Sequence, residues 1–316
     1  MAKKNLAPDH EAWKEKLQKI PLQSKLFWAH SLKRFNTLKV GGAAACLVDV
    51  MHTEDLSRLL PFLRQEQIPW FILGKGSNLI FPDDGWPGVV LRLSSHFKQW
   101  EVLKEHRQIF VGAALADVTV ALRCASLGWS GLEFLIGIPG SIGGAIAMNA
   151  GAHGGEISQY LKKIWWMDMA GKVHEAEGKS LAFAYRQSPL NGKLGTVVTS
   201  ALFQLEASDP ETVKARIREL QTFREEKQPR NIPNCGSVFK NPDGRYAAEL
   251  IESAGLKGHC IGGAQISPVH SNFIVNQGEA TAQDVLALID LVQKTVWKTH
   301  QINLEPEVQI VAKDHY

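Results

Sequence analysis

Cysteine is scarce in this sequence, and the short motifs that hold metal ions are missing. The chain of 316 residues has four cysteines, and no two of them form a Cys-x-x-Cys pair. Such scattered thiols are typical of reduced cysteines in a cytoplasmic protein, and their spacing excludes a zinc ribbon. The 11 histidines include no His-Glu-x-x-His motif and no clustered ligand spacing, so we expect no metal site.

An excess of charge of one sign is also missing. Lys and Arg total 35, and Asp and Glu total 32, which leaves a formal net charge of +3. That balance is too weak to indicate a nucleic-acid-binding protein, although it is compatible with small anionic ligands. We therefore expect no nucleic-acid partner.

The sequence has no segment typical of a signal peptide or a membrane span. The first residues are charged throughout and lack an apolar core, so we expect no signal peptide. The most apolar window, residues 131–152, contains Glu133, Pro139 and six glycines. In lipid this window would leave backbone polar groups unsatisfied, so it indicates a buried loop and helix. We expect a soluble, cytoplasmic protein with no membrane partner.

The chain does contain enough apolar residues for a substantial core, because 45% of its residues are hydrophobic and 21% are charged. Its length predicts two or three domains. The patterns predict an α+β fold in which residues 1–30, with one short amphipathic helix, are an appendage to three blocks over 31–93, 94–206 and 207–316. The predicted elements are helices over 53–65, 117–127, 210–227, 245–254 and from Thr281, a hairpin over 164–177, and strands over 46–50, 70–74, 89–93, 108–114, 197–205, 272–276 and 307–311.

Two glycine-rich turns are the strongest local signs of a ligand site. Residues 74–78 (GKGSN) follow a predicted strand, as a phosphate-binding loop would, but they fit neither the Rossmann pattern, because position 79 is leucine, nor the Walker pattern. Residues 137–144 (GIPGSIGG) form the second turn and lead into a helical segment. Glycine lets backbone N–H groups approach a diphosphate without a Cβ in the way, although glycines also simply make tight turns. Two such clusters in one chain favour an uncommon cofactor cradle.

Six segments, taken in order, carry a resemblance to a known family. They are NTLKVGGAA (36–44), LGKGSNLIF (73–81), GLEFLIGIPGSIGGAIAMNAGAHGGEI (131–157), YRQSPL (185–190), GSVFKNP (236–242) and LEPEV (304–308). Over residues 30–312 the chain is similar to the UDP-N-acetylenolpyruvoylglucosamine reductases, the flavoenzymes that complete UDP-N-acetylmuramic acid in bacterial peptidoglycan synthesis. Arg186 and Ser237 are 51 positions apart, so the chain resembles the shorter type, which lacks a tyrosine-bearing loop.

The resemblance implies a cofactor, a fold and a reaction. It implies FAD held between two subdomains of the vanillyl-alcohol-oxidase (PCMH) type, over residues 31–93 and 94–206, and an α+β substrate-binding domain over 207–316. It implies NADPH as the reductant and a UDP-sugar enolpyruvyl ether as the substrate. Since no heptads or large apolar stripe are evident, we expect a monomer. Two alternatives stay open, namely another FAD oxidase of the same fold and a catalytically silent nucleotide-binding protein.

Three residues are carried over as catalytic by the motifs that match. Arg186 offers a planar guanidinium fork, which suits a substrate carboxylate that gathers charge. Ser237 is the expected proton donor, and Cys235, two residues earlier, is a weaker alternative. Glu307 is expected to complete the enolate site by hydrogen bonding with a raised pKa, whereas Glu305 precedes a proline and is expected to be exposed.

Further residues are carried over as binding groups. Arg224 is expected at FAD and Lys227 at the substrate, although both end the predicted helix over 210–227, where cations are favoured in any case. Asn241 is expected to meet the nucleotide sugar. The remaining residues expected to bind FAD are Gly74, Gly76, Ser77, Asn78, Gly140, Ser141, Gly143, Gly144, Asn149 and Gly151.

Overall fold

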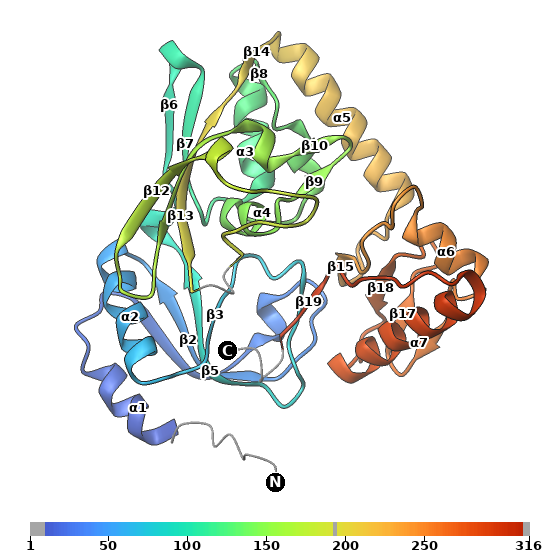
Figure 1. The fold of residues 1–316 in the computed structure, drawn as a ribbon, viewed down its shortest axis with the longest axis horizontal. Helices are drawn as coiled ribbons and strands as arrows, with labels where there is room; N and C mark the ends of the chain where they lie inside the picture. Colours follow the sequence, from blue (N-terminus) through green and yellow to red (C-terminus); the bar gives the residue numbers. More distant parts are fainter. Residues whose placement is uncertain (1–9, 192–194, 312–316) are drawn as a thin grey trace.

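The first lobe, residues 10–93, is built on a β-α-β unit. The computed structural model describes residues 10–191 and 195–311 of the chain (Figure 1). In the sheet β1-β2-β5-β3, strands β2 (Ala43–Val50), β5 (Trp86–Leu93) and β3 (Trp70–Ile72) are parallel, and β1 (Lys25–Ser31) is antiparallel to β2. Helix α2 (Thr53–Gln65) has the predicted bounds. It packs on this sheet through Leu56, Leu59, Leu60 and Leu63.

The N-terminal segment is part of this lobe, which differs from the predicted appendage. Helix α1 (His10–Gln18) buries Trp13 and Leu17 in the same core as α2. Strand β1 continues to Ser31, so the predicted boundary at residue 30 falls inside a strand of the sheet. No side chain of β1 is fully buried, because β1 is an edge strand. Its four apolar residues, 26–29, run consecutively and do not alternate with polar ones, so the period of a half-buried strand is missing.

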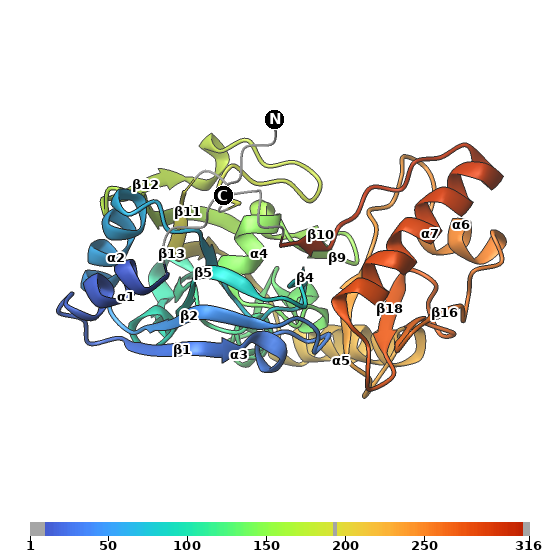
Figure 2. The same cartoon turned by 90° about the horizontal axis from the view of Figure 1, so that it is seen from below.

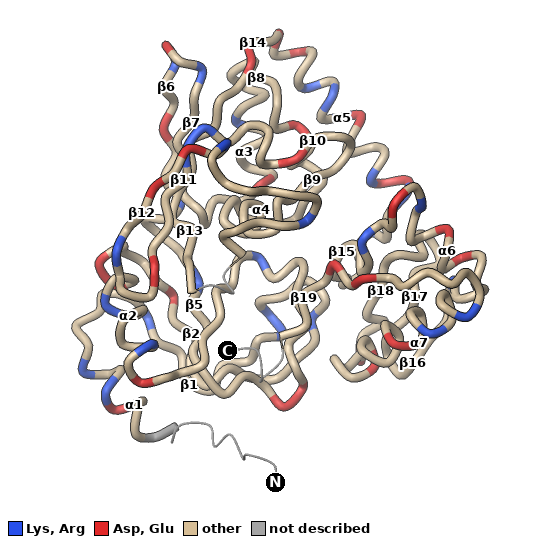
Figure 3. Tube along the Cα trace, viewed as in Figure 1, with Lys and Arg blue, Asp and Glu red and all other residues tan. Residues whose placement is uncertain are grey.

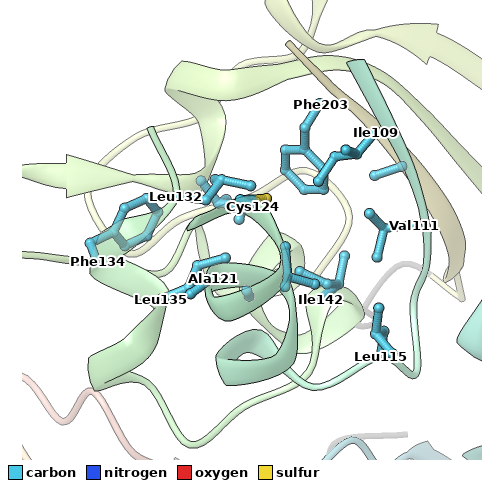
Figure 4. Packing of buried hydrophobic residues seen from close by; sticks show 14 of the residues in the cluster. Ile109, Val111, Leu115, Ala121, Cys124, Leu132, Phe134, Leu135, Ile142 and Phe203 are labelled. Atoms are coloured by element: carbon cyan, nitrogen blue, oxygen red, sulfur yellow. The ribbon is translucent and has the colours of Figure 1, made fainter. Parts of the chain in front are cut away.

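The second lobe, residues 94–227, is an antiparallel sheet of order β12-β11-β13-β7-β6 with helices against it. The predicted hairpin is confirmed, because β11 pairs with β12. Figure 4 shows the core that forms between the sheet and helix α3, with Val111, Cys124 and Phe203 among its side chains. The elements are β6 (Trp100–Leu103), β7 (Gln108–Gly112), α3 (Asp117–Ser126), α4 (Ile142–Met148), β11 (Leu161–Met167), β12 (Val173–Glu177) and β13 (Val197–Gln204).

Helix α5 (Pro210–Lys227) also packs on the second lobe. Its start is as predicted, since the Asp209 side chain accepts a hydrogen bond from the Thr212 N–H group at 2.9 Å. Val213, Ile217 and Leu220 join the core of the second lobe. The predicted block over 207–316 thus begins with a helix that packs on the block before it. Figure 3 shows positive and negative residues mixed along α5 and along the whole trace.

The third lobe, residues 228–308, places two helices on a small antiparallel sheet of order β15-β18-β17-β16. Figure 2 shows α6 and α7 at one end of the molecule, away from β1 and β2. Helix α7 starts as predicted, because the Thr281 side chain accepts from the Asp284 N–H group in a capping box. The elements are β15 (Asn234–Ser237), α6 (Ala247–Ser253), β16 (Cys260–Ile261), β17 (Ala264–Ile266), β18 (Phe273–Asn276) and α7 (Ala282–His300).

Strand pairing and a helix cap are among the contacts that tie the third lobe to the first. Strand β19 (Gln309–Ile310) leaves the third lobe and pairs in parallel with β4 (Leu79–Ile80), directly after the first glycine turn. The Asp83 carboxylate accepts hydrogen bonds from the Ala282 and Gln283 N–H groups at 2.9 and 3.0 Å, at the beginning of α7. The C-terminal segment that contains Glu307 is therefore held beside the turn at residues 74–78.

Within residues 10–191 and 195–311, no helix is both long enough and apolar enough to cross a lipid bilayer.

Short elements complete the described chain. The remaining strands are β8 (Trp129–Ser130), β9 (Gly151–Ala152), β10 (Gly155–Glu156) and β14 (Glu206–Ala207), and the 3₁₀ helices are η1 (Leu32–Phe35), η2 (Ser95–Lys98), η3 (Lys104–His106), η4 (Glu133–Gly137), η5 (Ile157–Tyr160) and η6 (Gly178–Ser180).

Candidate active site

A large cavity lies where the three lobes meet. Its volume is about 680 Å³, within the range of small-molecule and cofactor sites. Both glycine turns line it, and so do residues from β13, α5 and the third lobe. The residues predicted for the site that line this cavity are Gly74, Gly76, Ser77, Asn78, Gly140, Ser141, Gly143, Gly144, Gly151, Arg186, Arg224, Ser237 and Glu307.

The first glycine turn, residues 74–78, joins the first lobe to the catalytic segment. Gly76 has φ of +66°, and a Cβ there would lie 2.1 Å from the Phe35 carbonyl oxygen, so only glycine fits without a shift of the backbone. The Asn78 side-chain amide donates to the Glu307 carbonyl oxygen at 3.0 Å. The Gln309 N–H group donates to the Asn78 carbonyl oxygen, also at 3.0 Å. This turn therefore lines the cavity and also positions Glu307.

The second glycine turn, residues 137–144, meets the first across the cavity wall. A Cβ at Gly74 would lie 2.7 Å from the Ser141 Oγ, and a Cβ at Gly143 would lie 3.0 Å from the Ala113 Cβ. A Cβ at Gly140 would lie 2.2 Å from a carboxylate oxygen of Asp117. Close packing thus accounts for glycine at these positions: a side chain lies against Gly74 and Gly140, and both the side chain and the backbone of Ala113 lie against Gly143.

Alanine at Gly76 is expected to lower stability and FAD content together. Gly244 is a matched control, because its φ is +68° but nothing lies within 4 Å of a Cβ there. Both variants incur the ~1–2 kcal/mol cost of a left-handed alanine. Only Gly76→Ala adds a clash with the Phe35 carbonyl, which costs about 1–3 kcal/mol more. Thermal unfolding midpoints and bound flavin check this, and equal losses in the two variants would show that the contact with Phe35 is unimportant.

Arg186 lies in a tight turn that points its side chain at Glu307. Its φ is +56°, and the turn is closed by paired backbone hydrogen bonds between Ala184 and Gln187. The Arg186 Nε atom donates to the Glu307 Oε1 atom at 2.7 Å, and its Nη2 atom donates to the Gly151 carbonyl oxygen at 2.7 Å. The side chains of Arg186 and Glu307 are only 17% and 15% exposed. The guanidinium is thus fixed in place at the edge of the cavity.

Glu307 and Ser237 are neighbours across a short backbone bridge. The Glu307 N–H group donates to the Val238 carbonyl oxygen at 2.8 Å. Gly236, with φ of +76°, lies in an irregularity of β15 that turns the strand just before Ser237. The Thr37 hydroxyl, from the NTLK segment, donates to the Asn234 carbonyl oxygen at 2.6 Å and holds the start of that strand. Ser237 therefore lies on a braced strand beside the Arg186–Glu307 pair.

The environment of Glu307 changes its acidity in two opposing ways. Burial raises the pKa of Glu307, and the charge and hydrogen bond of Arg186 oppose that shift. The net direction is upward, in the direction expected for this residue from the sequence. A carboxyl that is buried and yet faces a guanidinium is more easily protonated than an exposed glutamate, and it still accepts a hydrogen bond from Arg186.

Cys235 and Glu305, the residues two positions before Ser237 and Glu307, lie in different environments from those two residues. Burial raises the pKa of the Cys235 thiol to about 12, and its side chain packs in the apolar core of the third lobe. Glu305 is 71% exposed and pairs with Lys240, as its position before a proline predicts. Neither side chain has the buried polar setting of the Arg186–Glu307 pair.

Three residues predicted as binding groups do not line the cavity. Asn149 is fully buried, where its side chain donates to the Ala184 carbonyl and accepts from the Ser158 N–H group at 3.0 and 3.1 Å. It thereby braces the turn that carries Arg186. The Asn241 side chain accepts from the Ala247 N–H group at 3.0 Å, at the start of α6. Lys227 ends α5 outside the residues of the cavity wall.

Arg224 does line the cavity, one turn before the end of α5. Its Nε atom donates to the Gln228 side chain at 3.2 Å. Desolvation lowers its pKa, which remains far too high for the guanidinium to lose its proton. Arg224 therefore adds a permanent positive charge to the wall, as an anionic ligand requires.

Two polar groups of the wall were not found from the sequence. The Asp117 carboxyl and the Thr196 hydroxyl are buried, line the cavity, and have no hydrogen-bond partner among residues 10–191 and 195–311. Buried polar groups are rarely left unpaired, so a ligand with hydroxyl and phosphate groups is a fitting partner. The glycine walls, the Arg224 charge and these unpaired groups together fit FAD. In the same ranges, no three His, Cys, Asp or Glu side chains are grouped to hold a metal ion.

Comparison with known proteins identifies the family. The family model described as FAD binding domain matches residues 44–177, and that described as UDP-N-acetylenolpyruvoylglucosamine reductase, C-terminal domain, matches residues 228–311. The UDP-N-acetylenolpyruvoylglucosamine reductase of Halalkalibacterium halodurans is 43% identical over 283 residues, which cover 90% of this chain and 93% of the relative. The chain belongs to the UDP-N-acetylenolpyruvoylglucosamine reductase family.

Other members of the reductase family agree over almost the whole chain. The Bacillus subtilis reductase is 39% identical over 281 residues, covering 89% of this chain and 92% of the relative. The crystal structure of the Thermus caldophilus reductase (MurB) superposes with a TM-score of 0.79 at 35% identity, covering 92% of this chain and all of that one. The chain is therefore an FAD-binding oxidoreductase of peptidoglycan precursor synthesis, with the predicted α+β FAD fold. Membership of this reductase family argues against the alternative of another FAD oxidase.

Proposed function

We propose that this protein uses NADPH to reduce the enolpyruvyl group of UDP-N-acetyl-3-O-(1-carboxyvinyl)-glucosamine, which gives UDP-N-acetylmuramate. The observation that carries the proposal is the meeting of three distant segments at one cavity. Arg186 pairs with Glu307 at 2.7 Å, and the backbone of Glu307 is bonded to the residue after Ser237. The family supports the same reaction, since its members are named as reductases of this enolpyruvyl sugar.

FAD would be held by the two glycine turns and Arg224, and when bound it supplies the hydride that passes from NADPH to the terminal vinyl carbon. The protein's own part is placement and charge. The turns at 74–78 and 137–144 bring peptide groups to the cavity surface without intervening Cβ atoms. On this proposal residues 31–93 and 94–206 are the two FAD-binding subdomains, and residues 207–316 are the substrate-binding domain.

Arg186 binds the substrate carboxylate, on which charge collects as the enolate forms. Its hydrogen bonds to Glu307 and Gly151 occupy two N–H groups of the guanidinium and fix the plane of the fork. A guanidinium has five N–H groups, so the remaining ones can donate hydrogen bonds to the substrate carboxylate. Donors that are fixed in advance stabilise a developing charge better than donors that must reorganise. Glu307 therefore acts through Arg186, and its raised pKa limits the negative charge beside the anionic substrate.

Ser237 donates the proton to the carbon next to the carboxylate. The hydroxyl lies on the cavity wall, and the strand that carries it is bonded on both sides, to Phe273 of β18 and to the segment with Glu307. A fixed hydroxyl can give up its proton to an enolate carbon and be resupplied by water. The reaction requires NADPH and the UDP-sugar as the binding partners of the protein. We propose that the protein acts as a cytoplasmic monomer.

The visible spectrum of the purified protein tests this function. The preparation should be yellow with flavin absorbance, NADPH should bleach it under anaerobic conditions, and the enolpyruvyl sugar should restore the colour with formation of UDP-N-acetylmuramate. A flavin that NADPH does not bleach would support the alternative of a catalytically silent nucleotide-binding protein. Bleaching without reoxidation by the enolpyruvyl sugar would show that the substrate has been assigned wrongly.

A further inference from the structure

Asp117 is a fully buried carboxyl group in the wall of the cofactor cavity. It is the first residue of helix α3 and has no exposed surface. Neither of its carboxyl oxygens has a hydrogen-bond partner among residues 10–191 and 195–311, although the residue borders the cavity. The reaction proposed above makes no use of this side chain. A buried carboxyl without a partner is costly, so its presence requires a physical explanation.

The second glycine turn is a direct neighbour of Asp117. The Asp117 backbone N–H group donates to the Gly140 carbonyl oxygen at 3.2 Å, and Ala116 forms a bridge with Ser141. A Cβ at Gly140 would lie 2.2 Å from the Asp117 Oδ2 atom, so the carboxyl lies directly against this turn. Asp117 is thus placed against one of the two turns that are predicted to line the FAD diphosphate.

The charge state of Asp117 follows from these neighbours. Burial raises its pKa well above the ordinary value, and the opposing effect of Lys75, from the first glycine turn, is smaller. The loop over 137–141 brings no titratable side chain, and the residues that follow Asp117 in the first turn of α3 are Val118, Thr119 and Val120. The positive end of α3 favours an anion only weakly by comparison with burial. The raised pKa favours the neutral acid, whose O–H group has no acceptor among residues 10–191 and 195–311.

We propose that Asp117 is a cofactor-binding residue that, as a neutral carboxylic acid, donates a hydrogen bond to a diphosphate oxygen of FAD. An ionised carboxylate at this position would repel the diphosphate. The neutral acid instead gives the diphosphate oxygen a donor and gives its own O–H group an acceptor. The same position accounts for glycine at residue 140, since a side chain there would displace the Asp117 carboxyl. The proposal relies on the FAD site assigned above but not on the identity of the substrate.

Binding of FAD to the apoprotein tests the proposal without a measurement of activity. Apoprotein is titrated with FAD, and flavin fluorescence reports the Kd between about pH 6 and about pH 9, where free Asp, Lys and Arg do not titrate. For the wild type, the Kd should rise as the pH increases, because loss of the proton removes the donor and adds a charge. Asp117→Asn keeps a neutral donor, so it should bind FAD and lose this pH dependence.

Removal of the donor should weaken FAD binding directly. Asp117→Leu has a similar shape and no donor, and its Kd should rise by about 10- to 100-fold, the range for a hydrogen bond to a charged group. Asp209→Asn, at the start of α5 and outside the cavity wall, is the matched control and should bind like the wild type. Should the leucine variant fail to fold, the comparison of the wild type with Asp117→Asn across pH still decides the question.

Two results would overturn the proposal. One is a wild-type Kd that does not depend on pH, combined with weak binding by Asp117→Asn, which would make Asp117 an anionic or structural group. The other is an Asp117→Leu variant that binds FAD as tightly as the wild type. A wild-type apoprotein that binds no FAD at any pH is a separate result, because it would remove the FAD site itself.

Discussion

Replacement of Ser237 by alanine is expected to slow reoxidation of the NADPH-reduced enzyme by the enolpyruvyl sugar by about 10²–10⁴-fold, the range for loss of a proton donor. Reduction by NADPH should stay close to the wild-type rate. The two half-reactions separate because Ser237 supplies a proton only to the sugar substrate. Its strand is held by backbone bonds to β18 and to the Glu307 segment, and alanine preserves those bonds. Stopped-flow absorbance of the flavin measures both rates in one preparation.

Ser253→Ala is the control for the Ser237 experiment. Ser253 lies on α6 of the same lobe, donates to the Leu250 carbonyl oxygen at 3.1 Å and is outside the cavity wall. Its replacement should leave both half-reactions unchanged. If Ser237→Ala slowed NADPH reduction as much as reoxidation, Ser237 would be a structural residue and the assignment of the proton donor would be wrong. A wild-type rate of reoxidation in Ser237→Ala would also rule out Ser237 as the proton donor.

The fold could be predicted well where the signal was local. Helix α2 has the predicted bounds because its leucines follow the helical period, and α5 and α7 begin where Asp209 and Thr281 cap them. The failures are long-range effects. Strand β1 has no buried side chain, and the two-residue pairing of β19 with β4 depends on segments more than 200 positions apart. The contact of α5 with the second lobe could not be predicted from its own sequence.

In the candidate site, too, the residues with a local signal in the sequence could be predicted, and those that meet only through long-range packing could not be predicted from a local pattern. The glycine turns could be found because glycine is favoured where another part of the chain packs against the backbone, and Gly74, Gly140 and Gly143 each have such a neighbour. The resemblance supplied Arg186, Ser237 and Glu307, which no local pattern would have joined. Their roles, like those of the expected FAD ligands, stay predictions.

The predicted residues that do not line the cavity, and the one that was missed, have physical explanations. Asn149 and Asn241 are amides at turns, and sequence does not distinguish an amide that binds a ligand from one that bonds to the backbone. Asp117 was missed for the opposite reason. An acidic residue at the start of a helix is ordinarily an exposed group that favours the helix dipole, whereas this one is buried and lies against the Gly140 turn, a contact between distant segments.

Arg186→Lys should slow reoxidation by the enolpyruvyl sugar by about 10²–10³-fold, while NADPH still reduces the flavin. Lysine keeps the positive charge but cannot bond to Glu307 and Gly151 while it presents a fork to a carboxylate. Arg216→Lys is the matched control, since Arg216 pairs with Glu219 on the exposed face of α5 and should contribute nothing to the rate. Near-wild-type reoxidation by Arg186→Lys would rule out a geometric role for the guanidinium.

The double variant Arg186→Lys/Glu307→Gln distinguishes a cooperating pair from two independent groups. Glutamine keeps an acceptor for the Arg186 Nε atom, so Glu307→Gln alone should cost less than Glu307→Ala, which leaves the guanidinium without its partner. If Glu307 acts only by fixing Arg186, the double variant should be no slower than Arg186→Lys, because the fork that glutamate orients is already gone. Losses that multiply would instead mean that Glu307 meets the substrate itself. The buried setting of the pair at 2.7 Å, with Arg186 also tied to Gly151, favours the first result.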